Sequence, residues 1–174
     1  MIGSARRVCP LGVAVALVGG SGHASPAECI WAKLSDADRE AIIARSPTAR
    51  LPATRSRKVD MAARACGVDA AFGGMLAQYY GAERAALAVV AAKGGPSEAE
   101  LVAFIAAQPS EVSETELTVA TGIFASEYLG QRLPSTMPPY QVGQIKAQMS
   151  MPVADYIVTR SVRLSLEAKA VAGR

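Results

Sequence analysis

The sequence predicts an all-α fold, a compact bundle of six or seven helices with short connections. Ser35, Ser97 and Ser113 are each followed three positions later by an acidic residue, and an apolar run of helical period comes next. A serine oxygen at a helix start accepts a hydrogen bond from a free backbone N–H, and the acid suits the positive end of the helix dipole. No run sustains the alternation of apolar and polar residues that is typical of a strand. These patterns favour helices throughout.

Proline and glycine residues divide the first half of the chain into three predicted helices, over residues 36–45, 56–66 and 69–92. Pro47 follows the first helix, because proline cannot continue it. Gly67 stops the second, since glycine readily adopts the left-handed conformation found at helix ends. The third helix has an apolar side, and Gly81 is a candidate break within it.

The second half holds four further predicted helices, over residues 98–108, 114–129, 140–149 and 152–170. Apolar residues surround most of the helix over 114–129, so we expect it to be central, with neighbours on several sides. Pro152 is expected to begin the last helix. A stripe at helical spacing along that helix is predicted to face the core: Val153, Ile157, Ser161, Leu164, Ala168 and Val171.

The first residues of the chain have the order of a secretory signal peptide. Arg6 and Arg7 precede an uncharged apolar run over 8–20, and small residues follow. The apolar run is shorter than the roughly 20 residues that a membrane-spanning helix needs. We therefore expect a signal over residues 1–24, with cleavage after Ala24 or, alternatively, after Ala27. The remaining single helical domain, residues 25–174, is expected to be periplasmic or secreted, with no transmembrane segment.

The charge of the chain is low and unevenly distributed. Its net charge is +3, and removal of Arg6 and Arg7 with the signal leaves 16 basic and 15 acidic residues, or +1. Nucleic-acid binding is not expected, because it needs a concentrated basic surface. Residues 96–130 hold six acidic and no basic side chains. This acidic segment either packs beside basic neighbours in the fold or binds a cationic partner.

Two cysteines, Cys29 and Cys66, remain after the predicted signal. An even number of cysteines in an oxidising compartment indicates a disulfide, and their spacing matches no zinc or haem motif. We expect the bond to tie the start of the exported chain to the end of an early helix.

Much catalytic chemistry is excluded by composition. The only histidine, His23, lies in the predicted signal, so the exported domain has no imidazole for a Ser-His-Asp triad, a metal site or haem ligation. No glycine-rich phosphate loop is present. No cofactor or metal is expected.

Carboxylates remain available for hydrolysis. Glu83 and Glu127 lie among apolar residues and are the candidate catalytic acids, because glycoside cleavage uses a carboxylate pair with one raised pKa. Candidate interaction residues form an acidic and a basic group: Glu98, Glu100, Glu111, Glu114 and Glu116, and Arg50, Arg55, Arg57 and Lys58.

The sequence favours an exported, non-catalytic helical domain that acts by binding a protein of the cell envelope, as an adaptor, a chaperone-like factor or an inhibitor of the immunity type. The alternative is a carboxylate-dependent hydrolase that acts on cell-wall glycan. The basic group also predicts a weak contact with an anionic envelope surface.

Overall fold

The structure, a computed structural model, describes residues 24–45, 50–108 and 114–172. These residues form packed helices without strands, which confirms the predicted all-α bundle. The helices are α1 (Pro26–Ala32), α2 (Asp36–Ile43), α3 (Ala53–Ala65), α4 (Ala70–Ala92), α5 (Glu98–Ala106), α6 (Glu114–Gly130) and α7 (Pro139–Ala172).

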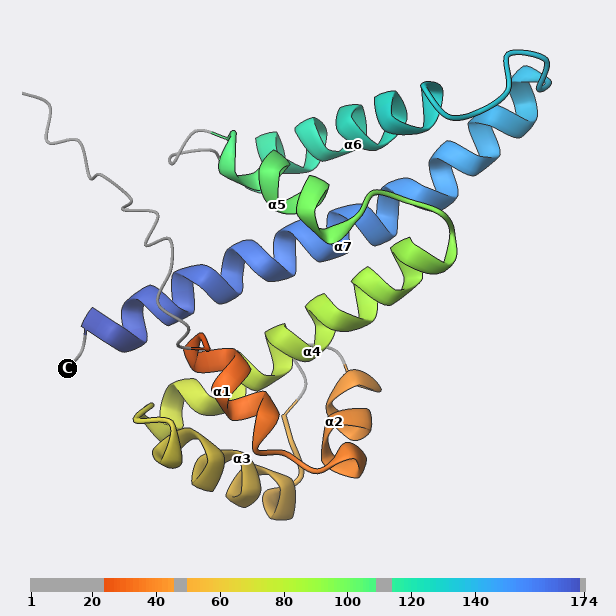
Figure 1. Cartoon of the computed structure of the whole chain (residues 1–174). Coiled ribbons are helices and arrows are strands. Elements are labelled where there is room, and N and C mark those ends of the chain that lie inside the picture. The colour runs from red at the N-terminus through yellow and green to blue at the C-terminus, as the bar shows by residue number, and fades with distance from the viewer. Residues whose placement is uncertain (1–23, 46–49, 109–113, 173–174) are drawn as a thin grey trace, which may run out of the picture.

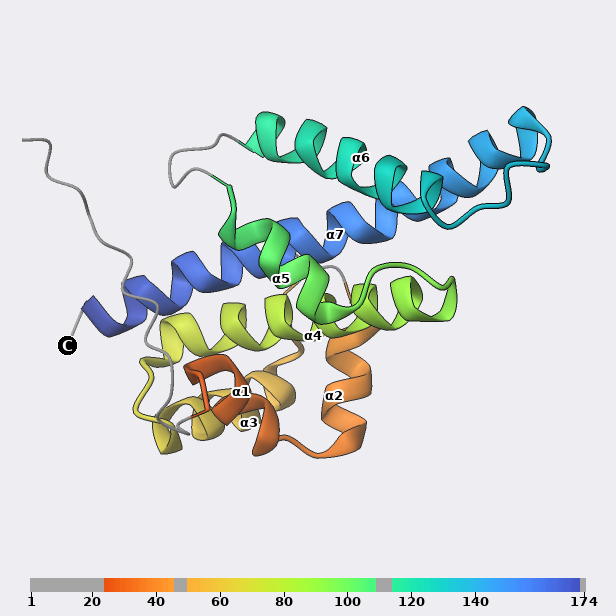
Figure 2. The same ribbon diagram turned by 45° about the horizontal axis from the view of Figure 1, so that its top comes forward.

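The long helices α4 and α7 run side by side and antiparallel, and the other helices pack around this pair (Figure 1). Gly95, just after α4, approaches Met149 in the first half of α7, whereas the middle of α4 faces the second half of α7. Helices α1, α2 and α3 pack on α4, and α6 packs on the opposite side of α7 (Figure 2). The pair α4–α7 is therefore the centre of the fold.

The buried apolar residues form two clusters, one towards each end of the α4–α7 pair. The first joins α1, α2, α3 and the first half of α4; it includes Ile30, Leu34, Ile42, Val59 and Leu76. The second joins the second half of α4 to α5, α6 and α7; it includes Val90, Leu101, Leu129, Val153 and Ile157.

The predicted disulfide is confirmed. Cys29 in α1 and Cys66, the residue that ends α3, are bonded with an S–S distance of 2.08 Å and a Cα–Cα distance of 5.9 Å. Gly67 follows with a φ of 67°, as expected of the glycine that stops a helix. The bond holds α1 against α3 at the edge of the first apolar cluster.

Two of the three predicted serine starts are confirmed, and the third lies outside the described residues. Ser35 and Ser97 cap α2 and α5, and Glu100 completes a reciprocal capping box with Ser97. Helix α1 was not predicted, and its start is a second reciprocal capping box, between Ser25 and Glu28. Pro26 in its first turn needs no hydrogen-bond donor, which suits that position.

The structure corrects two predictions in the first half. Helix α3 begins at Ala53, not at Ser56. Helix α4 continues through Gly81, because this glycine serves packing and not a break. A Cβ atom there would lie 2.9 Å from both Trp31 and Ile42, so its absence lets α1 and α2 approach α4.

The structure also corrects the predicted end of the chain. Pro152 lies inside one continuous helix, α7, and does not separate two. Met149 and Val153 are buried on either side of it, so packing stabilises the helix through the proline. The predicted inward stripe is right for Val153 and Ile157 and wrong beyond them: Leu164 and Val171 are exposed.

Helix α6 is not central, contrary to the prediction. It packs on α7 with one face, which consists of Leu117, Thr121, Ala125 and Leu129 at every fourth position. Val119 and Ile123 on its other side are exposed. Apolar residues around most of this helix therefore do not mean that other helices pack on all its sides.

The described helices test the prediction that residues 25–174 hold no transmembrane segment. None of them combines the length and the apolar character that crossing a membrane requires. Most of the predicted signal lies outside the described residues.

We expect loss of the disulfide to destabilise the fold without abolishing the helices. Closing a loop of this length stabilises a protein by about 2–4 kcal/mol, chiefly through the entropy of the unfolded chain. The double variant Cys29→Ala/Cys66→Ala should lower the free energy of unfolding by that amount in urea titration. Reductant should destabilise the wild type similarly and leave the variant unchanged; an unaffected wild type would contradict the bond.

Candidate functional site

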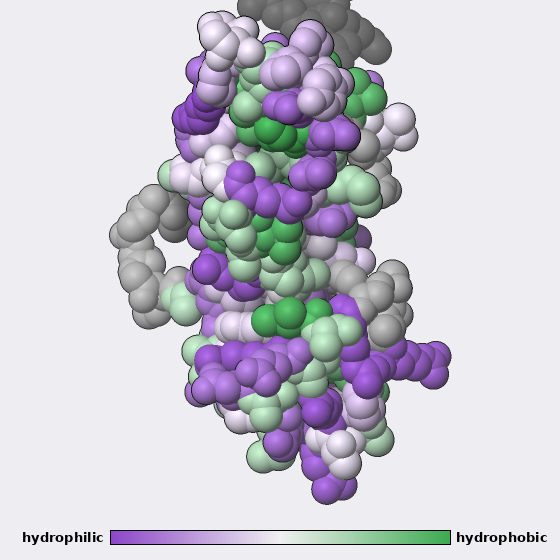
Figure 3. All heavy atoms as spheres, turned by 90° about the vertical axis from the view of Figure 1, so that its right-hand side faces the viewer, coloured by the Kyte–Doolittle hydropathy of each residue, from purple (hydrophilic) through white to green (hydrophobic). Residues whose placement is uncertain are grey.

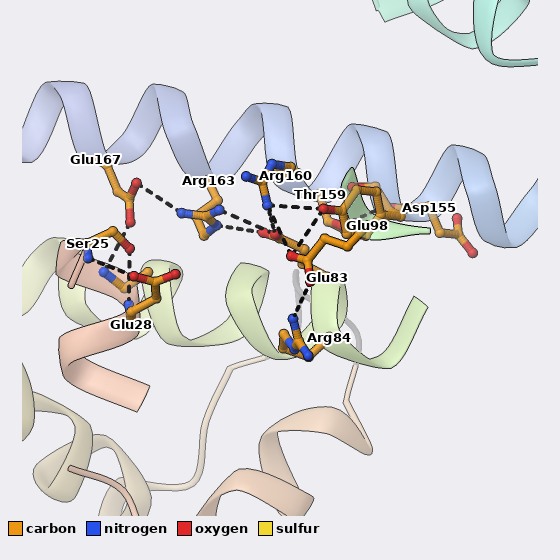
Figure 4. Close-up of polar contacts among 12 residues, drawn as sticks. Ser25, Glu28, Glu83, Arg84, Glu98, Asp155, Thr159, Arg160, Arg163 and Glu167 are labelled. Atoms are coloured by element: carbon orange, nitrogen blue, oxygen red, sulfur yellow. Dashed lines mark hydrogen bonds and ion pairs between the residues drawn. The ribbon is translucent and has the colours of Figure 1, made fainter. Parts of the chain in front are cut away.

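A buried cluster of charged residues lies between the two apolar clusters, where the middle of α4 faces α7 (Figure 4). Glu83 of α4 is only 1% exposed, and its carboxylate accepts hydrogen bonds from two arginines of α7. Arg163 donates through Nε at 2.6 Å and through Nη2 at 3.3 Å, and Arg160 donates through Nη1 at 2.6 Å. The charge of Glu83 is thus enclosed by two guanidinium groups.

The cluster extends from Arg163 to the start of α1. The Nη1 atom of Arg163 donates to Glu167, one turn further along α7, at 3.0 Å. The other oxygen of Glu167 accepts the backbone N–H of Ala27 at 3.1 Å. That N–H belongs to the first turn of α1, where helix geometry leaves backbone donors without partners. One chain of hydrogen bonds therefore joins α4, α7 and α1.

A second branch extends from Arg160 towards α5. The Nη1 atom of Arg160 also donates to the Tyr156 hydroxyl oxygen at 3.0 Å, and it forms an ion pair with the Glu98 carboxylate at 3.6 Å. Glu98 in turn pairs with Arg84 at 3.1 Å. Burial raises the pKa of Tyr156 to about 12, against the opposing effect of Arg160, so its hydroxyl stays neutral and can hydrogen-bond.

The charges of the cluster are matched inside the protein. No buried polar side-chain atom among the described residues lacks a hydrogen-bond partner. Burial disfavours the charge of Arg163, but Glu83 and Glu167 outweigh that effect and raise the pKa of the Arg163 guanidinium. The cluster is therefore a structural ion-pair network in which Arg163 remains charged.

The structure does not bring the two candidate catalytic acids into one site. Glu83 is buried and bound by Arg160 and Arg163, which leaves no open carboxyl for a substrate. Glu127 is exposed on the outer side of α6. Groups of three or more histidine, cysteine, aspartate or glutamate side chains able to hold a metal do not occur in the described part of the chain.

The acidic segment is partly neutralised by contacts within the protein. Glu100 accepts from Ser97 and pairs with Arg132 at 3.2 Å. The Ser97 hydrogen bonds, with a smaller effect of Arg132, lower the pKa of Glu100. Together with the pairing of Glu98, this supports packing beside basic neighbours. Of the other members, Glu116 is exposed, Glu114 begins α6, and Glu111 lies outside the described residues.

The basic group is divided between paired and open side chains. Lys58 pairs with Asp38 at 2.9 Å, and hydrogen bonds from Ser35 and Lys58 lower the pKa of Asp38. Arg55 donates to the carbonyl of Ala37 at 3.3 Å. The remaining basic residues around α3 that make no ion pair with the described residues are Arg50, Arg57 and Arg64.

A surface around Met61 includes Arg57 and Lys58 of the predicted basic group. The Met61 side chain is 64% exposed, and two shallow hollows flank it. Arg57 and Arg64 line one hollow, and they lie four positions before and three after Met61, on the same face of α3. Lys33 and Lys58 line the other hollow. We call this surface, Lys33, Arg57, Lys58, Met61 and Arg64, the α3 face.

The ion-pair network was missed, although the sequence holds a sign of it. Arg163 and Glu167 are four residues apart, the spacing of an ion pair on one helix face, within a helix whose apolar stripe is otherwise regular. The predicted stripe passed through Ser161 and Leu164 instead. Only the position of Glu83 on the facing helix shows that the polar residues point inward.

We expect Glu83→Gln to be strongly destabilising. The substitution preserves size but removes the buried negative charge that Arg163 and the half-buried Arg160 share, and breaking a buried ion pair costs about 3–5 kcal/mol of folding free energy. Urea unfolding followed by circular dichroism measures the loss. The matched control, Glu127→Gln, changes an exposed glutamate and should stay within about 0.5 kcal/mol of the wild type. Equal stabilities of the two variants would contradict the structural role of Glu83.

These residues form an ion-paired interior and a surface on which Arg57 and Arg64 lie beside Asp60. Arg57 and Arg64 offer charge to a partner, whereas Glu83 is bound within the fold. Comparisons with protein-family models, curated proteins and solved structures found no match to this chain.

Proposed function

We propose that this protein is an exported, non-catalytic helical domain that binds an acidic surface of an envelope protein through the α3 face. The observation that carries the proposal is the pair Arg57 and Arg64, two cations without an ion pair among the described residues, on either side of the exposed Met61. An adaptor, a chaperone-like factor and an inhibitor of the immunity type all act by binding a partner protein without catalysis.

The three central residues of the α3 face, Arg57, Met61 and Arg64, are of types that favour a protein partner. Arginine and methionine are enriched in protein–protein interfaces, whereas lysine is depleted there. Arginine can bind a carboxylate through two parallel hydrogen bonds, and an exposed methionine adapts its shape to the partner. The opposite side of α3, with Val59, Ala62 and Ala63, is buried in the first apolar cluster. The helix is therefore packed on one side while its outer face stays open.

The alternative, a hydrolase that acts on cell-wall glycan, has less support. A general acid needs a carboxyl that can hold and release a proton beside the substrate. The Glu83 carboxylate instead accepts hydrogen bonds from Arg160 and Arg163 away from solvent. An anionic envelope surface is a second candidate ligand, because the cations of the α3 face would also attract phosphate-bearing lipids.

Export is part of the proposal, and the contacts of α1 favour cleavage after Ala24 over cleavage after Ala27. The backbone nitrogen of Ser25 donates to Glu28 at 2.9 Å, so a new amino terminus there would carry its positive charge beside a carboxylate. Cleavage after Ala27 would instead remove Ser25 and its capping box, the fully buried Ala27 and its hydrogen bond to Glu167.

We therefore expect the exported protein to begin at Ser25. Mass spectrometry of the intact protein recovered from the cell envelope or the medium measures this directly. A chain that begins at Glu28 would contradict the argument from α1, and a chain that retains Met1 would contradict export through a cleaved signal.

We expect Arg57→Glu/Arg64→Glu to reduce recovery of the partner at least about ten-fold, since each reversal replaces attraction by repulsion. The measurement is a pull-down from envelope extract with quantitative mass spectrometry. The control, Lys93→Glu/Lys169→Glu, changes the net charge equally at exposed positions elsewhere and should retain the partner.

A second experiment distinguishes a protein partner from a lipid surface as the ligand of the α3 face. The wild-type protein is incubated with phosphatidylglycerol vesicles and sedimented at low and moderate salt. Retention on vesicles without a stoichiometric protein partner would favour the anionic surface. Equal recovery by both double variants would contradict a role for the α3 face.

A further inference from the structure

A groove of about 400 Å³ lies between α2, α4 and α7, away from the α3 face. Small residues of α4 form its floor, namely Ala82, Ala85 and Ala86, and Val89 continues the same stripe one turn on. Ile43 at the end of α2 and Pro152 of α7 form its walls. On the side of the molecule where α2 and the end of α4 lie, apolar residues gather along the middle (Figure 3).

The apolar residues of this groove remain accessible. Val89 is 43% exposed, and Ile43 is exposed to a similar degree. Met151 is 72% exposed and lies four residues before Asp155, so it projects from α7 one turn before that lining residue. The surface thus has both a hollow floored by alanines and a projecting, adaptable side chain beside it. The hollow and the projecting Met151 side chain are complementary in shape.

One cation and one anion line the same groove. Asp155 has no ion pair with the described residues, and its side chain lies outside the network that holds Arg160 and Arg163 (Figure 4). Arg45 donates to the backbone carbonyl of Arg50 at 3.2 Å but pairs with no described carboxylate. Each charge is therefore available to an opposite charge on a partner.

We propose that this groove is the interface between two copies of the chain. In a two-fold dimer the same patch meets itself, so that residue 45 of one copy faces residue 155 of the other, twice. A patch with one unpaired arginine and one unpaired aspartate is complementary in charge to a second copy of itself. A net charge of +1 after loss of Arg6 and Arg7 adds little repulsion between copies. The α3 faces then provide two binding sites per assembly.

The first test places a charge in the groove. The exported chain should sediment as a dimer that dissociates on dilution, and Val89→Asp should raise its dissociation constant at least about ten-fold, because a charge would be buried without a partner. The control is Val119→Asp, a substitution of the same type at the exposed Val119 on α6, which should leave the dimer intact. Circular dichroism confirms that both variants fold.

The second test uses the charge pair. Arg45→Asp and Asp155→Arg should each weaken self-association several-fold, since each places like charges opposite one another. An equimolar mixture of these two variants should form a dimer again, because every pair between them is opposite in charge. The double variant Arg45→Asp/Asp155→Arg should also recover self-association.

Three results would overturn the proposal: a wild-type chain that is monomeric at all concentrations, equal effects of Val89→Asp and Val119→Asp, or a mixture of the charge variants that fails to associate. Because these measurements need no envelope partner, their failure would leave the proposed function of the α3 face standing.

Discussion

The ion pairs of Glu83 with Arg160 and Arg163 hold α7 in one position along α4. These ion pairs lie at the middle of the α4–α7 pair, between the two apolar clusters. Apolar packing is non-directional, so by itself it would allow α7 to lie along α4 in several registers. Hydrogen bonds of 2.6 Å from Arg160 and Arg163 fix one register of α7 along α4. Glu167 then orients α1, which the disulfide ties to α3. Breaking such a buried pair is costly, whatever its net contribution to stability.

This arrangement also determines which polar residues are left for function. The carboxylate that composition marked as a catalytic candidate, Glu83, holds the core together, and Glu98 and Glu100 pair with arginines of the same chain. Cations remain on the α3 face, and an apolar groove remains on another side. The helical bundle leaves these two surfaces open, and the proposals rest on them.

Local chemistry made much of the fold predictable. The Ser35 and Ser97 caps, Gly67 and the Cys29–Cys66 bond all act within a few residues or through a simple pairing rule, and the structure confirms each. The errors arose where tertiary packing decides. Neighbouring helices explain why Gly81 does not break α4, and packing on both sides of Pro152 explains the continuous α7. The inward turn of Arg163 depends on Glu83, a residue 80 positions away, which periodicity within one helix cannot reveal.

The most direct test of the central constraint is a double-mutant cycle between Glu83 and Arg163, with the free energy of unfolding measured in urea for Glu83→Gln, Arg163→Met and the double variant. If the ion pair holds α7 on α4, the double variant should be destabilised much less than the sum of the single changes, with a coupling energy of about 2 kcal/mol or more. Additive losses would show that the two side chains act independently and would contradict this account.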